Sequence, residues 1–365
     1  MTLSRLLCGP PAQARAWCEA WGPSVPLPQL LLALAATDTA AVEGISAAGS
    51  TPASRRQTAA ADAELLLLGP ERHRPHALPP LPAGVTPALI SHVVVRQLDL
   101  QPLVVDLGCA VAPAVPHLRL VGQARGGPAA CLSGGQALDR LRVLALFEQG
   151  RDWGRALAAK GRPLVLAECV PGGTTTAQAV MSGLGLDVEG LVSGSLRQPV
   201  HGLKAELVRQ GLAAAGAGEG AEPLQLVAAV GDAMQPLGAG LVLELAAAGV
   251  PLMLAGGSQM AAVLALALAV APMSLRGRIA ATAALATTAW VADEQSSDLT
   301  RLLARIASRW QVEPLAFAAA LRFGRGCHQA LRDYENGYVK EGVGAGGLAL
   351  LWELRGGDPR ELAIA

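Results

Sequence analysis

The chain has 365 residues, of which 52% are hydrophobic and 16% charged, and its 29 basic residues balance 29 acidic ones. This length is enough to bury a large core. The neutral balance provides no electrostatic footprint for nucleic acid, so we expect no nucleic-acid partner.

The cysteines and the hydrophobic runs indicate the cellular setting. Six cysteines are scattered without a C-x-x-C pair, which predicts reduced thiols in a cytoplasmic protein. Residues 260–275 are uncharged, but Pro272 interrupts them and the run is too short to span a membrane. Arg5 and Arg15 interrupt any apolar core of a secretory signal near the N-terminus. We therefore expect neither secretion nor a membrane partner.

The first 95 residues predict short elements joined by loops. Three elements are expected, namely a surface helix at 13–21 and strands at 29–36 and 64–68. Residues 71–84 are rich in proline and arginine and predict an extended connection. His73 and His76 lie within it, and the absence of further ligands favours a loop over a metal site. Thr86 and Pro87 predict the start of a helix.

Strands and helices alternate through the middle of the chain. Apolar runs predict strands at 102–106, 163–167, 191–195, 224–230 and 250–255, and helices at 137–160, 199–212, 233–248 and 260–270. Loops of small residues recur between them, at 122–127 and 133–136 among others. This alternation predicts an α/β fold, three-layered, with a parallel Rossmann-like sheet flanked by helices.

The ends of the chain differ in character. Charged amphipathic helices are predicted at 296–308 and 314–322, and a terminal helix at 348–354. We expect a nucleotide-binding α/β core over residues 96–290, with residues 1–95 and 291–365 forming a smaller, mainly helical lobe that completes the active site.

A glycine turn between the 163–167 strand and the next helix is the strongest candidate site. Residues 168–178 read Glu-Cys-Val-Pro-Gly-Gly-Thr-Thr-Thr-Ala-Gln. Backbone N–H groups and the positive end of a helix dipole meet at such a turn, and three threonines add hydroxyl donors. This pattern indicates an anion site, most simply for a phosphate. The alternative is an ordinary βα turn with a threonine cap.

A second glycine turn carries a carboxylate where the first carries hydroxyls. Glu341 precedes Gly-Val-Gly-Ala-Gly-Gly at the start of the terminal helix. A carboxylate at this position suits acid–base chemistry better than phosphate binding. The small-residue loop at 44–52 could line a ligand cleft, but its sequence favours a plain loop.

Residues 168–176 and 341–345 resemble the two signature loops of the nicotinate mononucleotide:dimethylbenzimidazole phosphoribosyltransferases, in their archaeal and cyanobacterial branch. The similarity extends through residues 44–52, 79–92 and 231–258. The resemblance implies transfer of the phosphoribosyl group of nicotinate mononucleotide to a benzimidazole-type or purine base, which builds the nucleotide loop of cobalamin. It also implies a cytoplasmic homodimer that needs no metal or redox cofactor.

The resemblance assigns roles to individual residues. Glu341 corresponds to the catalytic general base. Phosphate binding falls to Gly172, Gly173, Thr174, Thr175, Thr176 and, by a looser alignment, Lys204. The substrate pocket would include Glu168, Ser46, Gly256, Gly257, Ser258, Gly342 and Gly344.

Departures from the bacterial pattern leave the acceptor open. Val170 and Gly173 stand where the bacterial loop has a glycine and an asparagine, and Val343 replaces a threonine. Dimethylbenzimidazole, adenine or another base could be the acceptor. Two other functions remain as alternatives: a non-catalytic nucleotide-binding or regulatory protein of the same fold, and a membrane-associated protein suggested only by the apolar composition. Glu341 could simply cap a helix, Glu168 brace its loop and Lys204 face solvent.

Overall fold

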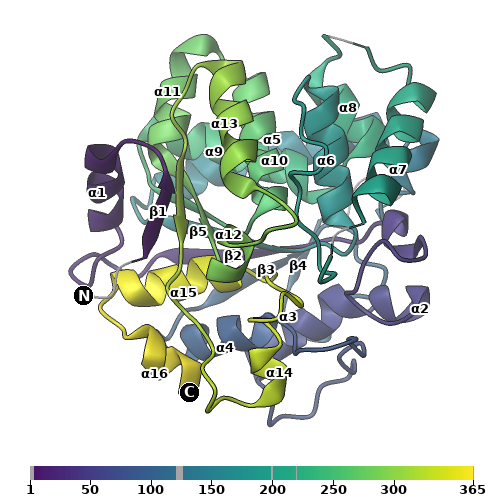
Figure 1. Ribbon diagram of the computed structural model, residues 1–365. Helices are drawn as coiled ribbons and strands as arrows, with labels where there is room; N and C mark the ends of the chain where they lie inside the picture. Colours follow the sequence, from purple (N-terminus) through teal and green to yellow (C-terminus); the bar gives the residue numbers. More distant parts are fainter. Residues whose placement is uncertain (1–3, 121–125, 199, 219, 365) are drawn as a thin grey trace.

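A computed structural model describes residues 4–120, 126–198, 200–218 and 220–364. Its centre is an eight-stranded sheet in the order β1-β8-β7-β6-β5-β2-β3-β4 (Figure 1). β1 pairs antiparallel with β8, and the other neighbours pair in parallel. The strands are β1 (Arg5–Cys8), β2 (Gln29–Leu34), β3 (Pro102–Asp106), β4 (Leu118–Arg119), β5 (Leu164–Cys169), β6 (Leu252–Ala255), β7 (Ala283–Thr287) and β8 (Leu315–Ala318).

Helices cover both faces of the sheet, which explains why the central strands are apolar throughout. Leu164 and Leu166 of β5 pack into one core, whereas Val165 and Ala167 pack into the other. The upper layer in Figure 1 holds α5 (Arg140–Ala158), α6 (Gly173–Gly183), α7 (His201–Ala214), α8 (Pro223–Val230), α9 (Met234–Ala248), α10 (Ser258–Val270), α11 (Met273–Thr282) and α13 (Leu299–Trp310). The lower layer holds α3 (Thr58–Leu68), α4 (Ala88–Gln97), α15 (Ala345–Leu354) and α16 (Pro359–Ile364).

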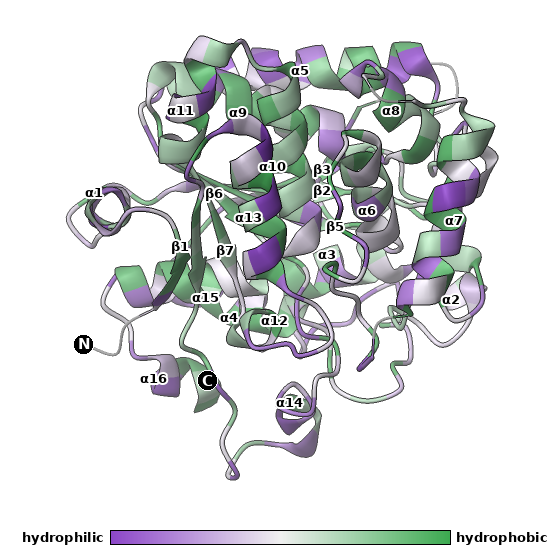
Figure 2. Ribbon diagram, turned by 45° about the horizontal axis from the view of Figure 1, so that its top comes forward, coloured by the Kyte–Doolittle hydropathy of each residue, from purple (hydrophilic) through white to green (hydrophobic). Residues whose placement is uncertain are grey.

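Short elements and one peripheral helix complete the fold. α1 (Pro11–Glu19) lies beside the β1 edge of the sheet (Figure 1). The short elements are η1 (Asp38–Ala41), α2 (Pro52–Arg55), η2 (Leu132–Gly134), α12 (Ala289–Ala292) and α14 (Gln329–Arg332). α10 is hydrophobic on nearly all sides and lies inside the upper layer (Figure 2), as expected for a buried helix. Among the described residues no helix is both long and apolar enough to cross a membrane.

The three-layer α/β fold predicted from the sequence is confirmed, but four element assignments are wrong. Residues 224–230 form α8, whose start is capped by the Glu222 carboxylate and carries Pro223. Residues 64–68 are the last turns of α3, and 314–322 contain the buried strand β8 in place of a helix. Residues 191–195 form turns without a strand. Of the loop predicted at 122–127, residues 122–125 lie outside the described part of the chain.

The sheet takes strands from both ends of the chain. β2 lies between β5 and β3, and β1 and β8 extend the opposite edge. The sheet therefore continues past the predicted boundaries at residues 96 and 290, because strand pairing places all of these strands within one layer. The lower helical layer comes from residues 58–97 and 345–364. The division into a core over residues 96–290 and a smaller lobe from residues 1–95 and 291–365 stays a prediction.

Candidate functional site

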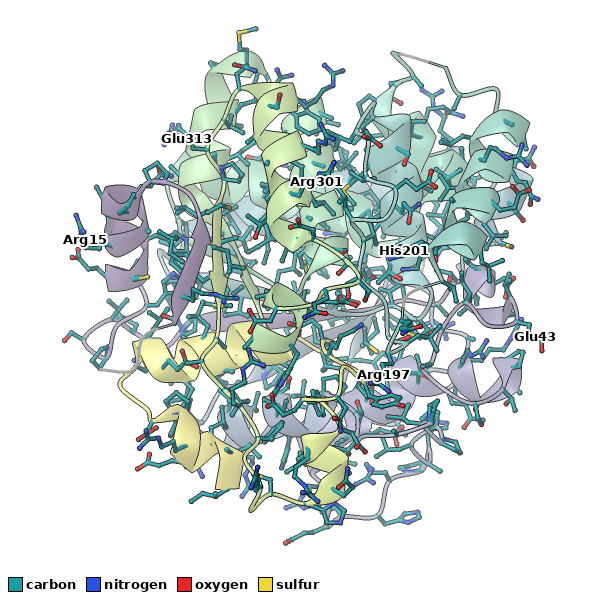
Figure 3. All side chains as sticks on the ribbon, in the orientation of Figure 1. Arg15, Glu43, Arg197, His201, Arg301 and Glu313 are labelled. Atoms are coloured by element: carbon teal, nitrogen blue, oxygen red, sulfur yellow. The ribbon has the colours of Figure 1, made fainter. Side chains whose placement is uncertain are left out.

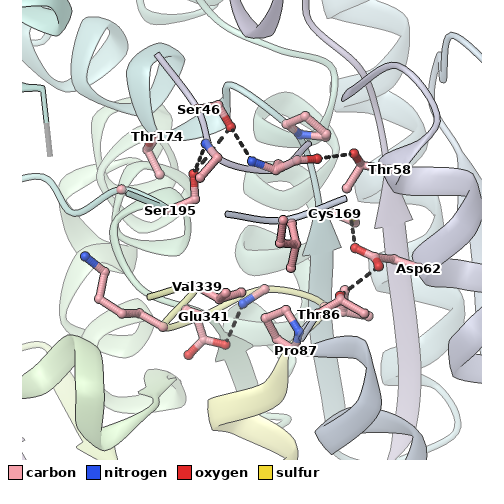
Figure 4. A pocket seen from close by; sticks show the side chains of 18 of the residues that line it. Ser46, Thr58, Asp62, Thr86, Pro87, Cys169, Thr174, Ser195, Val339 and Glu341 are labelled. Carbon is pink, nitrogen blue, oxygen red and sulfur yellow. Dashed lines mark hydrogen bonds between the residues drawn. The ribbon is translucent and has the colours of Figure 1, made fainter. Parts of the chain in front are cut away.

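A cavity of about 280 Å³ opens where the parallel strands end, the usual position of ligand sites in such sheets (Figure 4). Residues 168–174, which are the end of β5 and the turn after it, form one wall, and residues 338–343, which precede α15, form another. The backbone N–H of Val343 donates to the carbonyl of Glu168 at 3.0 Å. The two glycine turns singled out in the sequence are therefore in direct contact.

Most of the residues proposed for the site line this cavity. These are Ser46, Glu168, Gly172, Gly173, Thr174, Gly257, Ser258, Glu341 and Gly342. Five others do not line it: Thr175, Thr176, Lys204, Gly256 and Gly344. The hydroxyl of Thr176 donates to the carbonyl of Gly173 and to Asp232, and the amide of Gly256 donates to Ala286. Gly344 begins α15 with a φ of 73° and lies against Ala167.

Two helices direct their N-termini toward the upper side of the cavity. α6 begins behind Gly172, whose φ of 82° is a left-handed conformation that favours glycine. α10 begins at Ser258, after the turn at Gly257. Both starts place the positive end of a helix dipole at the cavity, which favours an anionic group there. Within the first turn of α6, the backbone N–H groups of Thr175 and Thr176 donate to the Gly172 carbonyl at 3.0 and 3.5 Å.

Lys204 supports the cavity from behind. Its ammonium donates to the carbonyl of Ser193 at 2.6 Å, and the side chain is buried. Burial lowers the pKa of Lys204 to about 7, although the nearby Glu294 carboxylate opposes the shift. Because Ser193 lines the cavity and Lys204 does not, this lysine holds a cavity loop in place. In this arrangement its ammonium bonds to the backbone of a lining residue and does not itself line the cavity.

Glu168 has an unusual environment for a carboxyl group. Its two oxygens accept from the amide of Val170 and from the Gln259 side chain, each at 2.9 Å. Burial, followed by the nearby charge of Asp232, raises the pKa of Glu168 to about 8. Glu168 is therefore mostly protonated at neutral pH and can donate a proton or a hydrogen bond.

Glu341 is held by more donors than Glu168. One oxygen accepts from the Thr287 hydroxyl at 3.0 Å and the Thr288 amide at 2.9 Å, and the other accepts from the amides of Gly342 and Gly346, both at 3.1 Å. Burial raises the pKa of Glu341, while these N–H and O–H donors act in the opposite direction. The carboxylate thus caps α12 and α15 and also lines the cavity.

The backbone that carries Glu341 is strained. Val339, Lys340 and Val343 have φ values of 65°, 51° and 52°, which β-branched residues such as valine rarely adopt. A buried ion pair holds this turn: the Lys340 ammonium lies 2.5 Å from Glu294, and their side chains are 2% and 4% exposed. Strain of this kind persists where the surrounding structure enforces it, most often at functional sites.

Several residues in and around the cavity could not be identified from the sequence. Asp62, on a helix, and the chain at 78–87, most of which the sequence predicts to be a linker, form the lower wall. No local sequence motif marks Gln259, or pairs Glu294 with Lys340. Arg197 stands 6.0 Å over the ring of Tyr338, a lining residue, and Figure 3 shows it between the two helical layers. Only the fold brings these side chains to the cavity.

The described residues contain no group of three or more His, Cys, Asp or Glu side chains arranged to hold a metal ion. Their chemistry at the cavity consists of helix starts and hydroxyls on one side and buried carboxyl groups on the other. An α/β protein with this site is suited to bind a phosphorylated ligand and to exchange protons with it.

Comparison with known proteins identifies the family. Residues 88–287 match the family model described as "Phosphoribosyltransferase". UPF0284 proteins of Prochlorococcus marinus (strain MIT 9313) and Parasynechococcus marenigrum (strain WH8102) are 54% and 51% identical, over 92% and 94% of this chain and 84% and 87% of their own. The chain belongs to this phosphoribosyltransferase family.

A solved structure shares the fold. The crystal structure of CobT from Thermus thermophilus is similar with a TM-score of 0.60 at 21% identity, over 97% of this chain and 95% of that one. A second structure from the same organism, described as nicotinate-nucleotide-dimethylbenzimidazole phosphoribosyltransferase, gives a TM-score of 0.56 at 20% identity, over 94% of both chains.

Proposed function

We propose that this protein transfers the phosphoribosyl group of nicotinate mononucleotide to a ring nitrogen of a benzimidazole-type or purine base, as part of cobalamin nucleotide-loop assembly. The observation that carries the proposal is the direct contact between the Glu168 and Glu341 loops around one cavity. The printed names of the structural neighbours agree with it. A homodimeric, cytoplasmic enzyme belongs to the same proposal.

The reaction needs an easily displaced group and a base. The anomeric carbon of the ribose forms a bond to the acceptor nitrogen while its bond to the nicotinate nitrogen breaks. Nicotinate leaves as a neutral pyridine ring, since its nitrogen was cationic in the nucleotide. The acceptor loses its ring proton, and Glu341, whose pKa is raised toward the working range, accepts it.

The geometry suggests how each side of the cavity contributes. The starts of α6 and α10 would bind the 5′-phosphate, and this fixes the ribose so that the transfer becomes effectively intramolecular. Glu168, protonated at neutral pH, would donate a hydrogen bond to the bound nucleotide. To accept a proton, Glu341 must give up one of the four hydrogen bonds that its two oxygens accept.

The donors around Glu341 also favour a second candidate function. The four hydrogen bonds that the Glu341 carboxylate accepts reduce the basicity that burial alone would give it. A nucleotide-binding or regulatory protein of the same fold would have no need for Glu341 to exchange protons.

An incubation with nicotinate mononucleotide and a panel of bases distinguishes the two functions. Chromatography should detect free nicotinate and a new riboside phosphate with at least one base. Glu341→Gln should lower kcat about 100-fold to 10,000-fold, the usual contribution of a general base, while affinity for nicotinate mononucleotide changes less than about threefold. The matched control is Glu353→Gln, a partly buried carboxyl group that also has a raised pKa and does not line the cavity.

The results decide between the candidates. Turnover by Glu341→Gln at the parent rate would show that Glu341 is not the base. Tight binding of nicotinate mononucleotide without nicotinate release, whatever base is added, would favour the regulatory function.

A further inference from the structure

The cavity has two halves of different chemistry. Helix starts, glycines and hydroxyls form the upper half, next to α6 and α10. The lower half, formed by α3 and the chain at 78–87, is largely apolar and suits a flat heterocycle. Its apolar lining residues are Leu78, Pro79, Leu81, Pro82, Ala83, Val85 and Pro87.

Asp62 is an exception within this apolar half. Among the lining residues numbered 46 to 87, it is the only charged side chain. Asp62 is 5% exposed and lies on α3, at the side of the cavity seen on the right in Figure 4. Burying a carboxylate in apolar surroundings is unfavourable unless hydrogen-bond donors compensate.

The protein supplies few donors to this carboxylate. One oxygen of Asp62 accepts from the Thr86 hydroxyl at 2.7 Å, and the other faces the thiol of Cys169, a weak donor, at 3.5 Å. Thr58, the other threonine of this half, donates to the Ala48 carbonyl instead. Within the described residues no other donor bonds to Asp62, although an ionised carboxylate can accept about four hydrogen bonds.

In the same cavity, Glu341 is a buried carboxylate whose burial is fully compensated by hydrogen-bond donors. Its carboxylate accepts four hydrogen bonds, three of them from backbone amides. Burial raises the pKa of Asp62 only to about 6, so it is largely ionised at neutral pH and retains its acceptor capacity. A bound ligand could supply the missing donor.

We infer that Asp62 accepts a hydrogen bond from the acceptor base, and that the protein prefers a nitrogen heterocycle with an N–H donor on the edge remote from the attacking nitrogen. This inference rests on the proposed function. Pro87 packs against Gly342, next to Glu341, and Thr86 bonds to Asp62. A flat base on this wall therefore presents one edge to Glu341 and the other to Asp62.

The preferred class follows from the chemistry of that second edge. An exocyclic amino group, as in an aminopurine, would donate to Asp62. A methylated edge, as in 5,6-dimethylbenzimidazole, would leave the carboxylate desolvated and without a new donor, which lowers affinity.

Adenine and purine are matched probes, because they differ only in the exocyclic amino group. With saturating nicotinate mononucleotide, kcat/KM for adenine should exceed that for purine by about 10-fold to 100-fold, the effect of one hydrogen bond to a charged group. Asp62→Leu should bring the ratio close to one. Asp62→Asn, which keeps the shape, should give an intermediate ratio and serves if the leucine variant does not fold.

Thr86→Val is the matched control for a structural role. This variant removes the bond between Thr86 and Asp62 but keeps the carboxylate, so the adenine preference should persist. If Thr86→Val abolished the preference as fully as Asp62→Leu, Asp62 would act only by anchoring Thr86, and the inference would be wrong.

Other outcomes separate this inference from the proposed function. An adenine-to-purine ratio near one in the parent protein, with transfer to either base, overturns the inference and leaves the function intact. No nicotinate release with adenine, purine or 5,6-dimethylbenzimidazole overturns the function. In that case calorimetric titration of adenine and purine into the parent and Asp62→Leu proteins decides, since equal affinities overturn the inference as well.

Discussion

Replacing Glu294 by glutamine should destabilise the protein by about 3 kcal/mol, because it leaves the buried Lys340 ammonium without its counter-ion. At the observed separation of 2.5 Å, two unit charges attract by about 7 kcal/mol at an effective dielectric constant of 20. Desolvation of both ions offsets much of this attraction. Removing one partner of such a pair typically costs about 3 to 5 kcal/mol.

Two local features place the expected loss at the lower end of that range. The Lys340 ammonium keeps one partner, the Leu196 carbonyl at 2.9 Å. The strained turn that the ion pair holds, at Val339 and Lys340, stores about 1 to 3 kcal/mol per residue, and part of this strain is released when the pair is broken.

Urea unfolding of the Glu294→Gln, Lys340→Met and double variants measures the loss and the coupling. The double variant should lose less unfolding free energy than the two single variants lose together, by about 1 to 3 kcal/mol, as expected for residues in contact. The control is Glu148→Gln, which removes an exposed pair with Arg151 and should change stability by less than about 0.5 kcal/mol. Additive losses in the double variant would refute the role of the ion pair.

The pH dependence provides an independent check. Burial alone would raise the pKa of Glu294, but the Lys340 charge and the hydroxyls of Ser193 and Ser297 outweigh it and hold this pKa below its usual value of 4.5. For a carboxyl group with a lowered pKa in the folded state, the stabilisation is present above the unfolded pKa and is lost as the pH falls through the folded one. The difference between the parent and Glu294→Gln proteins should therefore shrink below pH 4.5.

Two further substitutions test the site. Gly172→Ala places a Cβ 2.4 Å from the Thr37 hydroxyl oxygen and 2.9 Å from the Ala40 nitrogen. It should lower the free energy of unfolding by about 1 to 3 kcal/mol more than Gly190→Ala, which changes another left-handed glycine that has open space around it. Equal shifts in Tm for the two variants would contradict this steric reason. Lys204 has a pKa of about 7 in the fold and 10.5 ordinarily, so the unfolded chain binds more protons between these values and stability should rise with pH across them. Lys204→Met should lose this rise, and parallel stability–pH curves for the two proteins would show that Lys204 is not the group responsible.

The sequence was sufficient to predict an element where its local motif and its hydrophobic pattern indicate the same element type. A fully apolar run followed by a glycine turn marked β5, and the Glu-Cys-Val-Pro-Gly-Gly motif marked the start of α6. Apolar runs without such a context were ambiguous, because a buried helix and a buried strand can have the same composition. Residues 224–230 form a helix since Glu222 caps the run and Pro223 occupies its first turn, a local signal that would have corrected the prediction.

β8 could not be assigned from local sequence, because its neighbours in the sheet determine its conformation. Residues 315–318 occupy a register beside β7 that is buried on both faces, and this neighbour determines a strand where the pattern itself also allowed a helix. The sequence therefore determined the α/β class and the two glycine turns, since these depend on residues adjacent in the chain.

The tertiary structure decided how the chemical groups meet. Glu341 receives donors from Thr287 and Thr288, more than 50 positions away, and Asp62 faces Cys169 across 107 positions. Lys204, which the sequence suggested for phosphate binding, faces a backbone carbonyl behind the cavity. Burial and hydrogen-bond donors set the pKa of each group, and both are supplied by distant segments that only the folded sheet brings together.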